Sequence, residues 1–85
     1  MAKAINTKQK LVSSKQVPLI IERGGDGFYV VECPLFDGCY TQGKTIDEAL
    51  RNIQDVILLI LEEQKNKELL NEYHPSEISL HTISV

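Results

Sequence analysis

TIDEALRNIQDVILLIL, residues 45–61, carries the strongest structural signal in this 85-residue chain. It opens with a capping-box pattern, in which the Thr45 hydroxyl accepts from the Glu48 amide and Glu48 reaches back to the Thr45 N–H. Asp47 and Glu48 also lie at the positive end of the helix dipole. The apolar residues that follow recur at helical spacing: Ile46, Ala49, Leu50, Ile53, Val56, Ile57, Ile60 and Leu61. We therefore predict an amphipathic helix that begins directly after Thr45 and ends within residues 64–72.

Three short segments before this helix have the composition of β-strands. Residues 17–23 (VPLIIER) and 28–33 (FYVVEC) flank the glycine-rich turn at 24–27, which is typical of a hairpin. Residues 39–42 (CYTQ) form a third, shorter segment between two glycines. After the helix, residues 78–85 (ISLHTISV) have the pattern of a final strand. The sequence thus predicts an α+β fold of order β-β-β-α-β, with a small sheet packed on one long helix.

The charge of the chain is unevenly distributed. Nine Lys and Arg against twelve Asp and Glu give a net charge of −3, which disfavours a nucleic-acid-binding protein. Residues 1–16 hold four lysines and no acid, whereas residues 17–85 carry −7. We predict two units, a basic, solvated and flexible N-terminal arm at 1–16 and one α+β domain at 17–85. The arm could instead lie on the acidic body of a neighbouring subunit, or bind phosphates.

Neither a membrane segment nor a metal site is expected. The longest apolar run, residues 56–61, is far shorter than the roughly 20 residues that span a bilayer, and the N-terminus has no signal-like apolar stretch. We predict a cytoplasmic protein in which Cys33 and Cys39 are reduced and packed in the core. His74 and His81 lie more than thirty residues downstream of the cysteines, without a metal-type pairing.

The acidic side chains do not form a catalytic pattern. Six of them lie near strand ends, turns or the helix start: Glu22, Asp26, Glu32, Asp37, Asp47 and Glu48. Metal-assisted phosphoryl chemistry needs several carboxylates that converge on closely spaced ions, and this spacing does not produce such a group. We expect no catalytic residue and no cofactor. A metal-dependent nuclease that uses Glu22 or Glu48 is the least favoured alternative.

Apolar residues are in surplus on both the predicted sheet and the predicted helix. In the first strand Ile20 points away from Leu19 and Ile21, so both faces carry aliphatic side chains. On the helix, Leu59 falls in the middle of the polar side. Surplus apolar residues on two elements favour a contact surface, either in a homo-oligomer (dimer or tetramer) or with another protein. The alternative is internal cover by the arm or by the last strand.

Residues 27–61, GFYVVECPLFDGCYTQGKTIDEALRNIQDVILLIL, resemble the HicB-like antitoxin family. The resemblance is carried by residues 32–34 (ECP), 38–43 (GCYTQG) and 45–50 (TIDEAL), which occur in order and with the family's spacing. It implies a partial ribonuclease-H-like fold of β-β-β-α-β order. It also implies a partner, a HicA-type toxin that cleaves mRNA, whose active site the antitoxin occludes. An acidic body suits a basic RNA-binding surface.

The chain departs from fuller members of the family, many of which carry a C-terminal DNA-binding module. Only ten residues follow Pro75, so we expect a stand-alone member that does not bind an operator by itself. An alternative is a structural or regulatory homo-oligomer of the same fold with no toxin partner. The predicted partner contacts are exposed apolar or acidic groups: Leu35, Phe36, Asp37, Tyr40 and Leu59. Phe36 and Tyr40 could instead cap the core beneath their loop.

Overall fold

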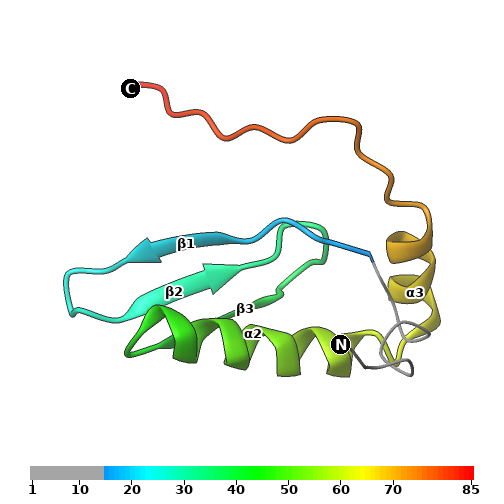
Figure 1. Ribbon diagram of the computed structural model, residues 1–85, viewed down its shortest axis with the longest axis horizontal. Coiled ribbons are helices and arrows are strands. Elements are labelled where there is room, and N and C mark those ends of the chain that lie inside the picture. The colour runs from blue at the N-terminus through cyan, green and yellow to red at the C-terminus, as the bar shows by residue number, and fades with distance from the viewer. Residues whose placement is uncertain (1–14) are drawn as a thin grey trace, which may run out of the picture.

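The computed structural model describes residues 15–85 and has one sheet layer and one helix layer (Figure 1). Its elements are β1 (Ile20–Arg23), β2 (Tyr29–Glu32), β3 (Tyr40–Gly43), α2 (Ile46–Ile60) and α3 (Gln64–Asn71). The three strands form an antiparallel sheet in the order β1-β2-β3. The predicted α+β class is therefore confirmed.

The β1–β2 hairpin is closed by the predicted glycine-rich turn. The Gly24 N–H donates to the Phe28 carbonyl at 2.9 Å, and Asp26 Oδ1 accepts from the Phe28 N–H at 3.0 Å. Gly27 has a φ of 89°, a left-handed conformation that glycine adopts without strain. This turn fixes the register that pairs Ile21 with Val31. That register decides which side chains of the sheet face the helix.

Helix α2 packs across β3 and β2 and encloses a small core. The fully packed residues are Val31, Cys33, Phe36, Cys39, Ala49 and Ile53. The helix approaches closely at Gly43, where an added Cβ would lie 2.5 Å from the Ala49 nitrogen. The two cysteines are free thiols inside this core, as predicted, and burial raises the pKa of each.

The start of α2 follows the predicted capping pattern with one difference. The Glu48 N–H donates to the Thr45 hydroxyl at 3.1 Å, as expected. The Glu48 carboxylate, however, accepts from the N–H of Lys44 at 2.7 Å and not from that of Thr45. The cap therefore reaches Lys44, one residue further upstream than the capping-box pattern predicts.

The predicted long helix is two helices, because the chain turns after Ile60. The buried Asn66 side chain donates to the Ile60 carbonyl at 2.8 Å and so supplies a donor to the carbonyl group at the end of α2. Helix α3 then runs across the end of the sheet (Figure 1) and brings Leu70 against the core. A straight helix would have carried Leu70 away from it.

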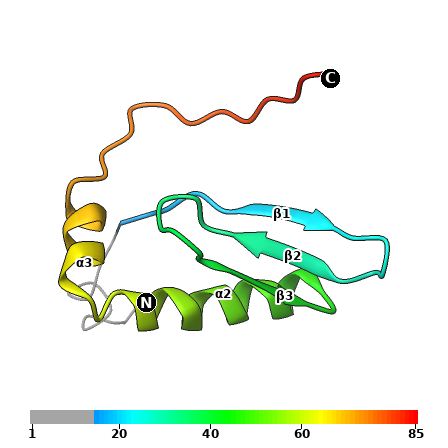
Figure 2. The ribbon, with the colours of Figure 1, turned by 180° about the vertical axis from the view of Figure 1, so that it is seen from behind.

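The final strand predicted at 78–85 is not formed within a single copy. Residues 73–85 belong to no helix or strand, and no backbone hydrogen bond joins residues 75–85 to the rest of the described chain. Figure 2, like Figure 1, shows this segment following β1 from end to end without joining the sheet. Alternation of apolar and polar residues favours an extended backbone, but a strand also needs hydrogen bonds to the edge of a neighbouring strand.

The predicted arm lies mostly outside the described residues, which begin at Lys15. Lys15 itself is half-buried, and its Nζ donates to the carbonyls of Asn71 at 3.1 Å and Tyr73 at 2.8 Å. This lysine therefore ties the start of the described chain to the end of α3. Within residues 15–85, no helix is long and apolar enough to cross a membrane.

Candidate interaction surfaces

The outward side of the sheet is a first candidate surface, which we call the outer face (Ile20, Glu22, Val30, Glu32, Tyr40 and Gln42). The strand register aligns these residues in two rows across the sheet, because paired residues point to the same side. Glu32 lies between Ile20 and Tyr40 in one row. Val30 lies between Glu22 and Gln42 in the other.

The outer face combines exposed apolar area with negative charge. Tyr40 is 65% exposed and Val30 is 40% exposed, although both belong to the sheet. Glu22 and Glu32 flank them and are also exposed. A flat surface with an aromatic side chain and two carboxylates is suited to a basic protein partner.

A second candidate surface lies where the β2–β3 loop meets the end of α2. It brings together Leu35, Asp37 and Leu59 around a depression of about 600 Å³, and we call it the loop-end depression. The rest of its wall is made by Ile60, Glu63, Lys65, Asn66 and Leu69. Leu59 is 66% exposed here, in agreement with its predicted place on the polar side of the helix.

The five predicted contact residues are thus divided among three places. Leu35, Asp37 and Leu59 share the loop-end depression, and Tyr40 lies on the outer face. Phe36 is only 3% exposed, as in the alternative that placed it in the core beneath its loop. The loop around Phe36 is closed by the Cys33 N–H, which donates to the Cys39 carbonyl at 2.9 Å.

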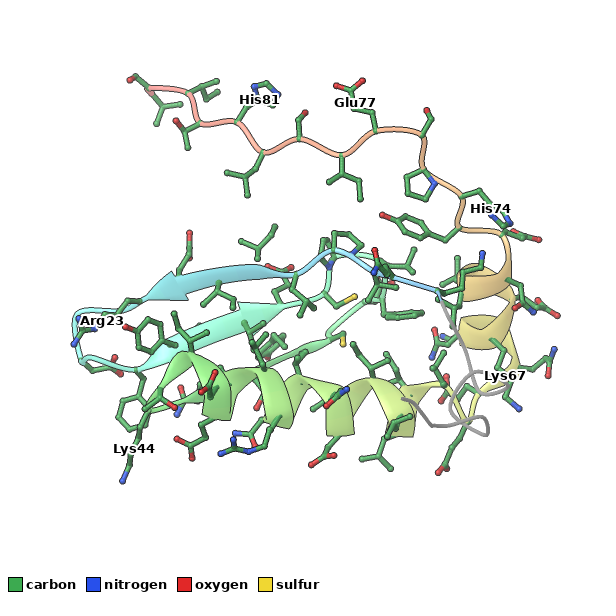
Figure 3. The ribbon with its side chains drawn as sticks, viewed as in Figure 1. Arg23, Lys44, Lys67, His74, Glu77 and His81 are labelled. Atoms are coloured by element: carbon green, nitrogen blue, oxygen red, sulfur yellow. The ribbon has the colours of Figure 1, made fainter. Side chains whose placement is uncertain are left out.

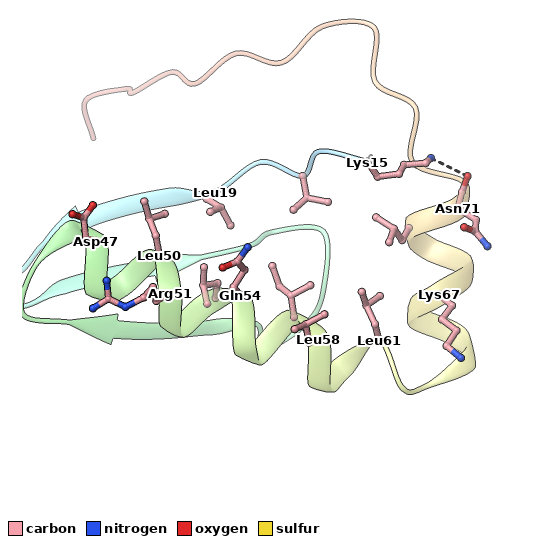
Figure 4. A pocket seen from close by; sticks show the side chains of 14 residues that line it. Lys15, Leu19, Asp47, Leu50, Arg51, Gln54, Leu58, Leu61, Lys67 and Asn71 are labelled. Carbon is pink, nitrogen blue, oxygen red and sulfur yellow. Dashed lines mark hydrogen bonds between the residues drawn. The ribbon is translucent and has the colours of Figure 1, made fainter. Parts of the chain in front are cut away.

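A third surface, a groove between α2, α3 and the residues that lead into β1 (15–19), was not predicted from the sequence (Figure 4). It has a volume of about 810 Å³ and an aliphatic lining that includes Leu19, Leu50, Ile57, Leu58, Leu61 and Leu70. Helix α2 lies mainly against β3 and β2, so the wall opposite it in the groove is made by Val17 and Leu19, which precede β1. Leu50 and Leu58 could have indicated the groove in the sequence. They make the apolar side of the helix wider than a three-stranded sheet can cover.

The rim of the groove is basic, in contrast to the net negative charge of residues 17–85. Lys15, Arg51 and Lys67 border it, with Asp47 as the acidic exception (Figure 4). Residues 17–85 as a whole carry −7. The groove and the outer face therefore present opposite charges around apolar centres.

The described residues do not assemble a metal centre. Within residues 15–85, no group of three or more His, Cys, Asp and Glu side chains could hold a metal ion. Glu22 lies on the outer face, whereas Glu48 caps the start of α2. These two carboxylates, singled out for the nuclease alternative, thus belong to different layers of the fold.

Comparison with known proteins identifies the family of the chain. A UPF0150 protein of Synechocystis sp. is 46% identical over 52 residues, which cover 61% of this chain and 75% of the relative. A UPF0150 protein of Thermoplasma acidophilum is 42% identical over 64 residues, which cover 74% of this chain and 93% of the relative. No solved structure matches the chain significantly. The profile of a family described as the HicB-like antitoxin of bacterial toxin-antitoxin systems matches residues 17–83, and the chain therefore belongs to this family.

Proposed function

We propose that this chain is an antitoxin that binds a HicA-type toxin, a ribonuclease that cleaves mRNA, and covers its active site. Its role is binding and not catalysis, and we place it in the cytoplasm with its mRNA-cleaving partner. The observation that carries the proposal is the family match over residues 17–83. The exposed, acidic and partly apolar outer face supports it.

Electrostatics supports a basic partner for this face. A ribonuclease must attract the phosphates of its substrate, so the surface around its active site is basic. Residues 17–85 carry −7, and every acidic side chain among them except Glu48 is exposed. Such a body attracts the toxin from a distance and, once bound, excludes RNA from the same surface.

We propose the outer face as the principal toxin contact. Tyr40 supplies a large exposed aromatic ring, the kind of residue that dominates binding energy at interfaces. Glu32 is its cross-strand neighbour and places a carboxylate beside it. The loop-end depression, with Leu35, Asp37 and Leu59, is the second contact region of this proposal.

The direct test is RNA cleavage by a purified HicA-type toxin from the same genome, measured with increasing amounts of this chain. We expect cleavage to stop near a one-to-one ratio of the two proteins. Unchanged cleavage at a large excess of the chain would overturn the proposed function.

Charge reversal then tests the surface. We expect Glu32→Lys to slow association with the toxin by about tenfold at low salt, because it reverses a charge inside the contact. Asp55→Lys is the matched control, since Asp55 is exposed on α2 and borders neither the outer face nor the two cavities. Equal effects of the two variants would show that net charge alone governs binding.

The alternative function is a homo-oligomer without a toxin partner. The groove favours it, because an apolar cavity with a basic rim suits an acidic chain better than a basic toxin. This alternative predicts self-association together with unaffected RNA cleavage in the same assay.

A further inference from the structure

The C-terminal segment, residues 75–85, has the side-chain pattern of a strand but no partner in the described chain. Glu77 and His81 lie on the side of the segment that points away from the sheet (Figure 3). The Ser79 hydroxyl lies 2.9 Å from His81 Nε2, as expected for neighbours on one side of an extended backbone. Ile78 and Leu80 therefore share the opposite side, and they are 60% and 68% exposed.

The sheet offers a matching vacancy at β1. The strand order β1-β2-β3 leaves one edge of β1 without a neighbour among the described strands. A strand added there, and along the residues that lead into β1, would place alternate side chains on the inward side of the sheet, above the groove that Val17 and Leu19 border. An alternating aliphatic segment such as residues 78–82 fits this position, because its apolar side chains would enter the groove and its polar ones would face solvent.

The segment does not fill this vacancy in its own copy. Its starting point is held at the end of α3, where Lys15 bonds to the carbonyls of Asn71 and Tyr73. From there the chain follows β1 while Ile78 and Leu80 stay exposed. The apolar segment and the open groove therefore occur in the same copy without meeting.

The charge of the rim identifies the occupant. Arg51 and Lys67 border the groove, so a basic toxin would be repelled there. A second copy of this chain is acidic over residues 17–85, and its residues 78–84 bring no Lys or Arg to the rim. Each copy offers one groove and one free segment, and in a two-fold pair each segment fills the groove of the other copy.

We propose that two copies of this chain exchange their C-terminal segments. Residues 77–84 of each copy add a fourth strand to the open edge of β1 of the other, with Ile78 and Leu80 seated in the groove. The exchanged strand adjoins the outer face only along β1, away from Tyr40 on β3. The exchange is independent of the proposed toxin, so all of its tests are made without toxin.

Cysteine cross-linking between copies tests the exchange. One copy carries Glu22→Cys on β1, and a second copy of different mass carries His81→Cys on the segment. We expect a short bismaleimide linker to join the two copies into a heterodimer when they are mixed. The unsubstituted chain is the control, because its two cysteines are buried thiols. No heterodimer from the mixture, or a cross-link only within one chain that carries both substitutions, would overturn the proposal.

Light scattering of variants in the C-terminal segment gives a second test. The substituted residues are exposed, so the substitutions should not unfold a single copy. We expect the unsubstituted chain to have the mass of a dimer and Leu80→Asp to have that of a monomer at the same concentration. Ile83→Asp is the matched control, since Ile83 is also exposed but lies on the other side of the segment, and it should remain dimeric. A monomeric unsubstituted chain, or a Leu80→Asp dimer as stable as the unsubstituted one, would contradict the exchange.

Discussion

The outer face and the groove are two partly apolar surfaces of the same small fold, but they differ in charge and in origin. The outer face is the unshielded side of a three-stranded sheet, where Glu22 and Glu32 surround Val30 and Tyr40. The groove is the gap left on the inward side, with Arg51 and Lys67 at its rim. A chain of net negative charge therefore holds both an apolar groove with a basic rim and an acidic, partly apolar sheet face.

Both surfaces depend on the same helix–sheet spacing, and Gly43 sets that spacing. The largest expected effect is therefore the loss of both surfaces together in Gly43→Ala, whose Cβ would lie 2.5 Å from the Ala49 nitrogen. We expect the free energy of unfolding to fall by about 3 kcal/mol, because backbone atoms would have to move apart. Urea denaturation measures this loss. Gly25→Ala is the control, since no atom lies within 4 Å of its added Cβ, and an equal loss in that variant would contradict the account.

Substitutions of two adjacent leucines can distinguish the groove from the loop-end depression. Leu58 lines the groove and Leu59 lines the loop-end depression, and both are exposed, so neither substitution should unfold the chain. We expect Leu58→Asp to weaken self-association by about thirtyfold, which corresponds to the roughly 2 kcal/mol of burying a leucine. Leu59→Asp should leave self-association unchanged and weaken toxin binding instead. Sedimentation equilibrium over a concentration series distinguishes the two, and the reverse pattern would exchange the roles of the surfaces.

The outer face is tested by removing its aromatic ring. We expect Tyr40→Ala to weaken toxin binding by about tenfold, or roughly 1.5 kcal/mol, because the ring would be lost from the centre of the contact. Self-association should not change, since Tyr40 does not border the groove. Titration calorimetry with the toxin provides the measurement. Unimpaired toxin binding would move the principal contact to the loop-end depression.

The smallest expected effect is the pH dependence of stability. It arises from two thiols in the core, so it should affect both surfaces equally. Burial raises the pKa of the Cys33 and Cys39 thiols above the ordinary value of 9.0, so the folded chain holds these protons more tightly than the unfolded chain. Stability should therefore be independent of these groups below pH 9 and should fall as the pH rises above it. Urea midpoints at increasing alkaline pH test this, with Cys39→Ala as the variant that should show a shallower decline. A midpoint that rises with alkaline pH would contradict it.

Sequence reasoning succeeded where structure is determined locally. The Thr45 cap, the turn before Phe28 and the exposure of Leu59 all follow from short-range patterns, and the structure has each of them. The break after Ile60 was missed because it depends on Asn66, whose polar side chain resembles any other residue on a solvated helix until it is seen to donate to the Ile60 carbonyl.

The remaining differences come from contacts between distant parts of the chain. Alternation over residues 78–85 indicates an extended backbone, but only a neighbouring edge makes it a strand, and the described chain supplies none. The groove likewise follows from the sideways position of α2 on the sheet, which no local pattern encodes. Phe36 was expected at a contact surface or in the core, and its 3% exposure follows from how the loop closes over the cysteines.

The mass of the complex between this chain and its HicA-type toxin, measured by light scattering, tests the central claim most directly. Separate surfaces for self-association and toxin binding predict a dimer of the chain alone and a complex of two chains with two toxins. A complex of one chain with one toxin would contradict the separation of the surfaces, because toxin binding would then displace the second copy. The absence of any complex would contradict the antitoxin function itself.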